Sequence, residues 1–246
     1  MARQSLLFAL LLPSALAFAD EAAHWGYQGE VGPAHWAALK PEYQQCKLGK
    51  TQSPIDIRGA KMAALPAIEF SYQAVPLHLI NNGHTIQASV PAGSFITVGS
   101  QRLELLQFHF HHPSETELNG HRFPLELHLV HQDAQGKLAV VAVLLADGPA
   151  NAALEGLWKY LPKEQGKESA PEGVTVDPSG LLPANRAYFT FPGSLTTPPC
   201  SEDVTWYVLR TPVRLSKPQV SAFAQLYPDN ARPVQPPHGR TVQMSK

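Results

Sequence analysis

Two short segments with alternating polar and apolar residues constrain the fold of this chain most strongly. Residues 107–111 read Gln-Phe-His-Phe-His, and residues 126–130 read Glu-Leu-His-Leu-Val. Successive side chains of a β-strand point to opposite faces, so the alternation predicts two strands, each with polar residues on one face and apolar residues on the other.

The polar residues of these segments include three histidines that two neighbouring strands could bring to one point. Gln107, His109 and His111 share a face of the first strand, and Glu126 and His128 share a face of the second. Three imidazoles suit a catalytic zinc that keeps a fourth position open for water. A His-x-His pair alone is a weak signal, because it also occurs by chance, in cupins and in barrel-fold hydrolases. The zinc hypothesis gains support from Gln107 and Glu126, which are placed to hold the second ring nitrogen of a ligand.

The rest of the chain predicts a mostly β protein in one domain. Its hydrophobic residues, 44% of the total, fall in short runs that 23 prolines and 17 glycines interrupt. This pattern is typical of many short strands joined by irregular loops. Strands are expected at residues 52–57, 68–72, 77–81, 85–90, 94–98, 103–111, 123–131, 138–145, 188–191 and 204–210. A turn is expected at 81–83, helices at 34–39, 151–160 and from 216, a loop at 163–173 and an extended tail at 228–237.

The first 19 residues have the features of a secretory signal. Arg3 precedes an apolar run at residues 6–12, and Ala17-Phe18-Ala19 is a small-residue cleavage site. We therefore expect cleavage near Ala19, with the remaining domain at residues 20–246. Removal of the signal leaves 18 Lys and Arg against 20 Asp and Glu, so we expect no binding to nucleic acid or to an anionic membrane.

The chain contains two cysteines, Cys46 and Cys200, and both remain after cleavage. In an oxidising compartment we expect them to form a disulfide, and two free buried thiols are the alternative. A cysteine zinc site is not expected, because neither residue belongs to a Cys-x-x-Cys pair.

Several motifs in one order make the chain resemble the α-class carbonic anhydrases of the secreted bacterial kind. They are His24-Trp25-Gly26-Tyr27, Gln52-Ser53-Pro54-Ile55, Asn82-Gly83-His84, the two histidine segments, residues 193–199 and Arg232-Pro233-Val234-Gln235. The resemblance covers nearly all of the mature chain. It implies a zinc lyase that interconverts carbon dioxide and bicarbonate. The implied fold is mostly β (α+β), with a large twisted, mainly antiparallel sheet and short peripheral helices in a single domain.

The resemblance also implies roles for individual residues around Zn²⁺. The metal ligands would be His109, His111 and His128, and the groups holding them would be Gln107, Glu126 and the backbone carbonyl of Asn230. Thr196 and Glu115 would orient the zinc-bound hydroxide that attacks carbon dioxide.

The substrate pocket and the proton path are implied in the same way. Carbon dioxide would lie against Val130, Val140, Leu195 and Trp206, and Thr197 would bind bicarbonate. His84 would be the proton shuttle, with Tyr27, Asn82 and Gln87 along a chain of waters. Sulfonamides or anions would inhibit the enzyme, which would be periplasmic or secreted. Its oligomeric state is left open, with a homodimer as one option.

Two residues depart from the pattern of many relatives, since His112 replaces a tryptophan and Thr116 replaces a histidine. Both are expected near the pocket rim. Two other functions fit the sequence less well. A zinc hydrolase is disfavoured because the chain lacks His-Glu-x-x-His, and a binding module without activity is disfavoured because all three ligands, Thr196 and Glu115 are present.

Overall fold

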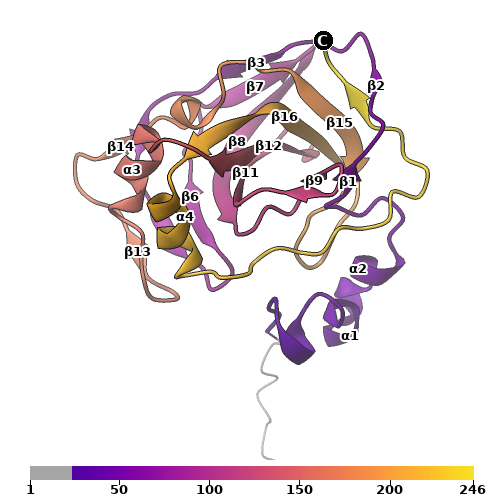
Figure 1. Ribbon diagram of the computed structural model, residues 1–246, viewed down its shortest axis with the longest axis horizontal. Helices are drawn as coiled ribbons and strands as arrows, with labels where there is room; N and C mark the ends of the chain where they lie inside the picture. Colours follow the sequence, from indigo (N-terminus) through magenta and orange to yellow (C-terminus); the bar gives the residue numbers. More distant parts are fainter. Residues whose placement is uncertain (1–23) are drawn as a thin grey trace, which may run out of the picture.

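A strongly twisted sheet of 12 strands forms the body of the protein (Figure 1). The computed structural model describes residues 24–246, so the expected signal sequence at residues 1–19 lies outside the described residues. Ten strands run in the order β13-β5-β6-β8-β11-β12-β16-β15-β17-β2, and β7 pairs with both β8 and β3. The expected mostly β fold with a large central sheet is confirmed.

The longest strands lie at the centre of the sheet. They are β8 (Gln101–His111), β11 (Leu125–Gln132), β12 (Leu138–Asp147), β16 (Val204–Leu215) and β15 (Tyr188–Gly193). Shorter strands surround them: β2 (Lys61–Met62), β3 (Ile68–Ser71), β5 (Leu79–Asn81), β6 (Ile86–Ser89), β7 (Phe95–Val98), β13 (Glu168–Ser169) and β17 (Gln243–Met244). Most pairs are antiparallel, although β12 runs parallel to β16.

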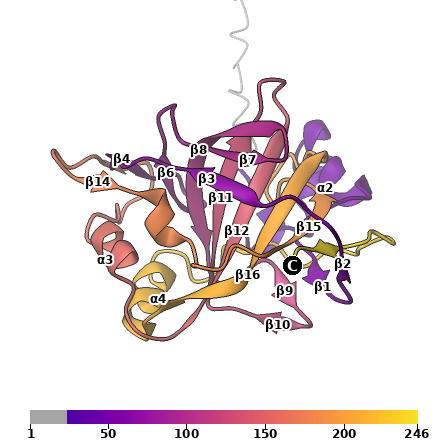
Figure 2. The same ribbon diagram turned by 90° about the horizontal axis from the view of Figure 1, so that it is seen from above.

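Two small sheets lie beside the large one (Figure 2). One contains β1 (Asp56–Ile57), β9 (Glu117–Leu118) and β10 (His121–Arg122), and the other pairs β14 (Thr175–Val176) with β4 (Val75–Pro76). The strand expected at residues 52–57 is therefore limited to its last two residues. The loop expected at 163–173 contributes β13, which is held by backbone pairing with β5 and has no alternation of its own.

The register of β8 and β11 sets the site. The two strands are antiparallel, with His128 directly opposite His109 and Glu126 opposite His111. Residues directly opposite in an antiparallel pair have neighbouring side chains on one face. The prediction that two adjacent strands bring the three histidines together is therefore confirmed.

The opposite face of these strands builds the larger hydrophobic core. Phe108, Phe110, Leu127 and Leu129 are fully buried in it. A second core on the histidine side contains Val130, Val140 and Trp206, among others. Strand β12 contributes to both cores, as expected for a central strand that is apolar on both faces.

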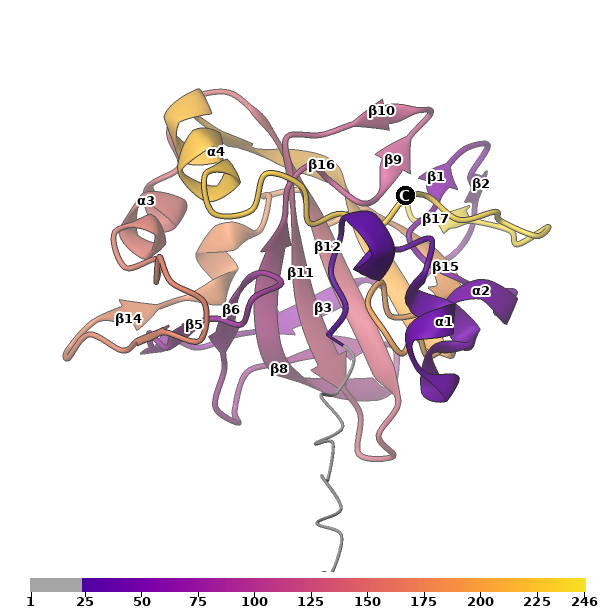
Figure 3. The same cartoon turned by 90° about the horizontal axis from the view of Figure 1, so that it is seen from below.

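Short helices lie at two sides of the sheet (Figure 3). The helices are α1 (Trp36–Leu39), α2 (Gln45–Leu48), α3 (Ala152–Trp158) and α4 (Lys217–Ala224), with 3-10 turns at Gly29–Val31, Pro41–Tyr43 and Pro178–Leu181. As expected, Asn151 caps α3 by accepting a hydrogen bond from the Leu154 amide (3.0 Å). Ser216 and Gln219 form a capping box at the start of α4. Among residues 24–246, no helix combines the length and the apolar character needed to cross a membrane.

The predicted disulfide is present, with the Sγ atoms of Cys46 and Cys200 2.02 Å apart. It joins the N-terminal segment to the loop that follows β15 and packs beside the fully buried Trp36. Disulfides persist in oxidising compartments, so the bond indicates an extracytoplasmic protein.

Candidate metal centre

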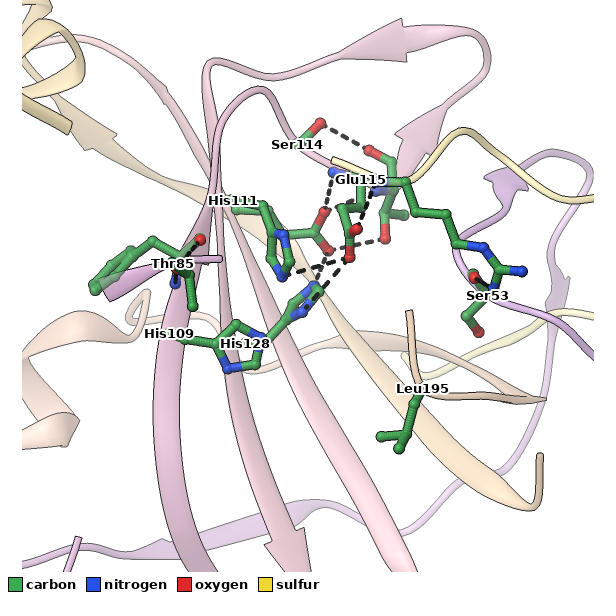
Figure 4. Close-up of polar contacts among 12 residues, drawn as sticks. Ser53, Thr85, His109, His111, Ser114, Glu115, His128 and Leu195 are labelled. Carbon is green, nitrogen blue, oxygen red and sulfur yellow. Dashed lines mark hydrogen bonds and ion pairs between the residues drawn. The ribbon is translucent and has the colours of Figure 1, made fainter. Parts of the chain in front are cut away.

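Three imidazoles converge on the polar face of β8 and β11. One ring nitrogen each from His109, His111 and His128 lies within 4.8 Å of the other two. Figure 4 shows the three rings pointing toward one another, with Glu115 beside His111 and His128. Side chains from two paired strands thus create the cluster.

The second nitrogen of each ring faces an oxygen on the outside of the cluster. These contacts are His109 Nδ1 to Gln107 Oε1 (2.8 Å), His111 Nδ1 to the Asn230 carbonyl (2.7 Å) and His128 Nε2 to Glu126 Oε1 (3.1 Å). An N–H donated to Gln107 and to the Asn230 carbonyl leaves the inward nitrogens of His109 and His111 with a free lone pair, and the Glu126 carboxylate favours the proton on Nε2 of His128. The inward atoms are Nε2 of His109 and His111 and Nδ1 of His128.

The residues fit a divalent metal ion. His111 Nε2 is buried without a hydrogen-bond partner, as a nitrogen reserved for a metal would be. Burial, followed by the neighbouring His111 and His128, lowers the pKa of His109 well below its usual range. Burial also lowers the pKa of His111, against the opposing effect of the Asn230 carbonyl. Neutral imidazole is the form that binds a metal.

Glu126 is fixed from behind by residues that follow β8. Its Oε2 accepts from the amides of Glu115 (2.8 Å) and Thr116 (2.7 Å), and its Oε1 accepts from the Thr116 hydroxyl (2.8 Å). Burial raises the pKa of Glu126, but His128 and the bonds from Thr116 outweigh burial and lower it. Thr116 is fully buried, so it lies behind the ligands and does not belong to a pocket rim.

Glu115 is a second fully buried carboxyl group beside the cluster. Its Oε2 lies 3.5 Å from His111 Nε2 and 3.9 Å from His128 Nδ1. Burial raises the pKa of Glu115 to about 7, against the opposing effects of His128, the Arg232 amide and the Thr196 hydroxyl. A bound cation would favour the ionised carboxylate.

Thr196 lies in the loop between β15 and β16. Its side chain is buried, whereas Leu195 and Thr197 on either side are partly exposed. The loop is closed by backbone bonds from Leu195 N to the Ser201 carbonyl (2.9 Å) and from Cys200 N to the Thr197 carbonyl (2.9 Å). These bonds hold the threonine hydroxyl on the side of Glu115.

An apolar wall adjoins the cluster. Val130 on β11 is paired with Val140 on β12, and Val140 is paired with Trp206 on β16. Leu195 packs against this group. The wall meets the metal ligands where the Trp206 ring contacts that of His128, with centroids 5.0 Å apart.

His84 follows the tight turn at residues 81–83, where Gly83 has a φ of 86°. The turn is fixed by Asn82 Oδ1, which accepts from the amides of His84 and Thr85, both at 2.9 Å. The His84 ring stacks on Trp25, with centroids 3.6 Å apart and planes 5° apart. Burial, followed by neighbouring His24, lowers the pKa of His84 to about 4.

The other two residues expected on the proton path lie on separate elements. Gln87 on β6 is the register partner of His109. Tyr27 lies in the N-terminal segment, where burial, followed by the charge of Glu115, raises its pKa well above the usual value.

The remaining histidines lie outside the cluster. His112 Nδ1 faces the Pro228 carbonyl (2.8 Å), and the buried His131 faces the Tyr72 hydroxyl (2.8 Å). Two features were missed by the sequence reasoning, namely the stacking of Trp25 on His84 and the buried side chain of Arg232. Both residues belong to motifs that the resemblance used, but a motif does not show which atoms meet.

Comparisons with known proteins agree with this geometry. Residues 31–246 match the family model described as eukaryotic-type carbonic anhydrase. The chain is 44% identical to a carbonic anhydrase of Klebsiella pneumoniae, over 95% of this chain and 96% of that protein. It is also 44% identical to a carbonic anhydrase of Nostoc sp., over 89% of this chain and 85% of that protein. A solved α-carbonic anhydrase of Thermovibrio ammonificans, in complex with sulfanilamide, is 44% identical and superposes with a TM-score of 0.87 over 91% of this chain and 99% of that one.

Proposed function

This chain belongs to the α-class carbonic anhydrases, enzymes that interconvert carbon dioxide and bicarbonate, and from that premise we propose which residues perform the reaction. The observation that carries the proposal is the convergence of three imidazoles whose second nitrogens all face oxygen acceptors.

His109, His111 and His128 would hold Zn²⁺. Three neutral ligands leave the metal its full double charge, and zinc in such a site supplies a water that is acidic enough to act as a nucleophile near neutral pH, as is established for this family. Gln107, Glu126 and the Asn230 carbonyl would keep the rings in the tautomer that the metal needs.

Thr196 and Glu115 would orient the attacking oxygen. The Thr196 hydroxyl has one proton to donate, and an ionised Glu115 can only accept. Donation to Glu115 leaves the hydroxyl oxygen as an acceptor toward the attacking water, which selects the lone pair that faces the substrate.

The apolar wall would receive carbon dioxide, which has no charge and few polar contacts to offer. Val130, Val140, Leu195 and Trp206 would bind it by contact and exclude competing water. Thr197, at the more exposed end of the loop, would hydrogen-bond to bicarbonate as it leaves.

His84 would carry the proton away, with Tyr27, Asn82 and Gln87 beside the path. With a pKa of about 4, the stacked ring is neutral at pH 7 and a poor proton acceptor. We therefore propose that the ring leaves Trp25 and enters a more hydrated position to take the proton.

Sulfonamides and small anions would inhibit the enzyme at the metal, since the solved Thermovibrio relative is a complex with the inhibitor sulfanilamide. We propose export to the periplasm or the outside of the cell. The disulfide supports export, and the expected signal at residues 1–19 would direct it.

Metal analysis combined with stopped-flow hydration of carbon dioxide tests the proposal. The mature protein should contain one zinc per chain and lose activity on chelation or on addition of a sulfonamide.

Thr196→Ala should lower kcat/KM about 100-fold, the scale of loss caused by misplaced reacting groups. Thr196→Ser, which keeps the hydroxyl, should retain most of the rate. A zinc-free protein with full activity, or equal rates for wild type and Thr196→Ala, would contradict it.

A further inference from the structure

Arg232 is a buried cation that the proposed mechanism does not use. Its side chain is 2% exposed, and it forms no ion pair within residues 24–246. Burial lowers its pKa to about 10, so the guanidinium remains charged at neutral pH. A buried charge is strongly destabilising unless hydrogen bonds compensate it, so the contacts of this group indicate its purpose.

The guanidinium donates its hydrogen bonds to one short segment, residues 46–53. Nη1 donates to Gln52 Oε1 (2.9 Å) and to the Ser53 carbonyl (2.7 Å), and Nη2 donates to the Cys46 carbonyl (2.8 Å). The group also lies over Trp36, 5.7 Å from the ring centroid. A planar fork with fixed donors can hold three acceptors in one arrangement, which a single ammonium cannot.

The segment that the guanidinium holds is itself bonded to the loop that carries Thr196. Ser53 N donates to Ser194 Oγ (2.9 Å), and Ser194 N donates back to Ser53 Oγ (3.2 Å). Gln52 Nε2 donates to the Cys200 carbonyl (3.0 Å). Both ends of the loop are therefore fixed to residues that the guanidinium contacts.

The backbone amide of the same arginine contacts Glu115, the carboxyl group that acts with Thr196 in the proposed mechanism. Its amide donates to Glu115 Oε1 at 2.8 Å. Arg232 thus contacts Glu115 directly and is linked to the loop of Thr196 by hydrogen bonds through Gln52 and Ser53.

We propose that Arg232 is a positioning residue that sets the separation between the Thr196 hydroxyl and the Glu115 carboxyl. The proposal rests on the proposed function of that pair in orienting the attacking oxygen. Loss of the fork should let the loop move relative to Glu115 while the amide bond and the metal ligands remain in place. The effect should fall on kcat/KM, which reports the attack, more than on kcat in weak buffer, which includes proton release.

Arg240 provides a matched control. Its guanidinium also binds this part of the protein, donating to the Gln52 carbonyl (2.7 Å), the Pro192 carbonyl (2.9 Å) and the Pro237 carbonyl (3.0 Å). Its hydrogen bonds include neither Ser53, which bonds directly to Ser194 of the loop, nor Cys46. Arg240 is partly exposed, whereas Arg232 is buried. If arginine bonds to this segment acted only by stabilising the fold, Arg240→Lys would also lower kcat/KM.

The test compares four variants, Arg232→Lys, Arg240→Lys, Thr196→Ala and the double variant Arg232→Lys/Thr196→Ala, each with its zinc content measured. Arg232→Lys should lower kcat/KM about tenfold, because a displacement of 1 Å can cost about 100-fold and the loop remains tied by the disulfide. Arg240→Lys should stay near wild type. The double variant should be no slower than Thr196→Ala, since the arginine acts through the threonine.

Crystal structures of the two lysine variants provide a readout independent of rate. In Arg232→Lys the Thr196 Oγ1 to Glu115 distance should increase, and in Arg240→Lys it should not. An unchanged distance, or losses that multiply in the double variant, would overturn the proposal. If Thr196→Ala keeps the wild-type rate, the function proposed for Thr196 is wrong, and the crystallographic distance alone decides the positioning role.

Ser53→Ala serves if Arg232→Lys does not fold. It removes the Ser53 Oγ acceptor and leaves the charge in place. Ser53→Ala should lower kcat/KM by less than the tenfold expected for Arg232→Lys, and this loss should disappear in the Thr196→Ala background. That result supports positioning of Thr196 through Ser53. An unchanged kcat/KM with an unchanged loop structure overturns the proposal.

Discussion

The two faces of β8 and β11 are built from alternate residues of the same strands, yet they differ in what burial requires. On the core face, Phe108 and Leu129 are fully buried among other apolar side chains and need only be packed. On the metal face, His111, His128 and Glu126 are equally buried, and nearly every polar atom needs a specific partner. The core face supplies stability, and the metal face uses part of that stability to hold polar groups out of water.

The largest expected effect comes from removing a ligand on the metal face. His109→Ala should abolish stable zinc binding and reduce hydration to the level of the metal-free protein. The loss of zinc affinity should exceed the roughly 10- to 100-fold fall that follows when a residue hydrogen-bonded to a metal ligand is replaced. Metal analysis and stopped-flow hydration measure it, and undiminished zinc and activity would refute the assignment. The free energy of unfolding of the metal-free protein should change little, because His109 is a partly exposed polar residue.

The neighbouring residue on the core face should behave in the opposite way. Phe108→Ala should lower the free energy of unfolding by about 3–5 kcal/mol, the usual cost of a large cavity in a packed core. Zinc content and kcat/KM of the folded fraction should stay near wild type. Denaturant unfolding gives the first quantity, and a loss of zinc from a variant that remains folded would show that the two faces are not separable.

His131 is a histidine on the core face, and it should respond to acid. It pairs with Ala139, is fully buried and has a pKa lowered by burial to about 3. The unfolded chain, with a histidine pKa of about 6.5, binds this proton more readily, so acid favours unfolding between these values by about 1.4 kcal/mol per pH unit. From pH 7 to pH 5, the metal-free wild type should therefore lose about 2 kcal/mol more stability than metal-free His131→Gln. Equal losses would mean that His131 is not held neutral in the fold.

The smallest effect is expected at His84, which is on the metal side and binds no metal. His84→Ala should lower kcat about tenfold in weak buffer, within the range of proton-transfer contributions, and added imidazole should restore it. Strong buffer should hide most of the loss. Equal losses in strong and weak buffer would exclude His84 as the proton shuttle.

The difference between the faces also explains how much the sequence could predict. Alternation in residues 107–111 and 126–130 was enough to predict the two strands and the side chains that share a face, because a strand repeats every two residues. It indicated that the histidines could converge if the strands were neighbours, and the register of β8 and β11 supplies that condition. A different signal, the continuously apolar run at residues 138–145, is typical of a strand buried on both faces, as β12 is. Short strands such as β13 and β17 could not be predicted, since backbone pairing with a neighbour holds them and their side chains show no period.

The contacts around the site were predictable only in part. The resemblance named Gln107, Glu126 and Asn230, but no pattern placed Thr116 behind Glu126 or joined Arg232 to Ser53. These contacts span up to 179 positions in the chain, so they depend on the completed fold. The stacking of His84 on Trp25 was hidden for the same reason.

Diffraction data collected at the zinc absorption edge, from crystals of the mature protein grown with zinc, would show whether the three imidazoles on the polar face of β8 and β11 bind zinc. We expect one strong anomalous peak, about 2.0–2.1 Å from Nε2 of His109, Nε2 of His111 and Nδ1 of His128. Rings turned away from one another with no peak between them, in crystals that contain excess metal, would contradict zinc binding by these histidines.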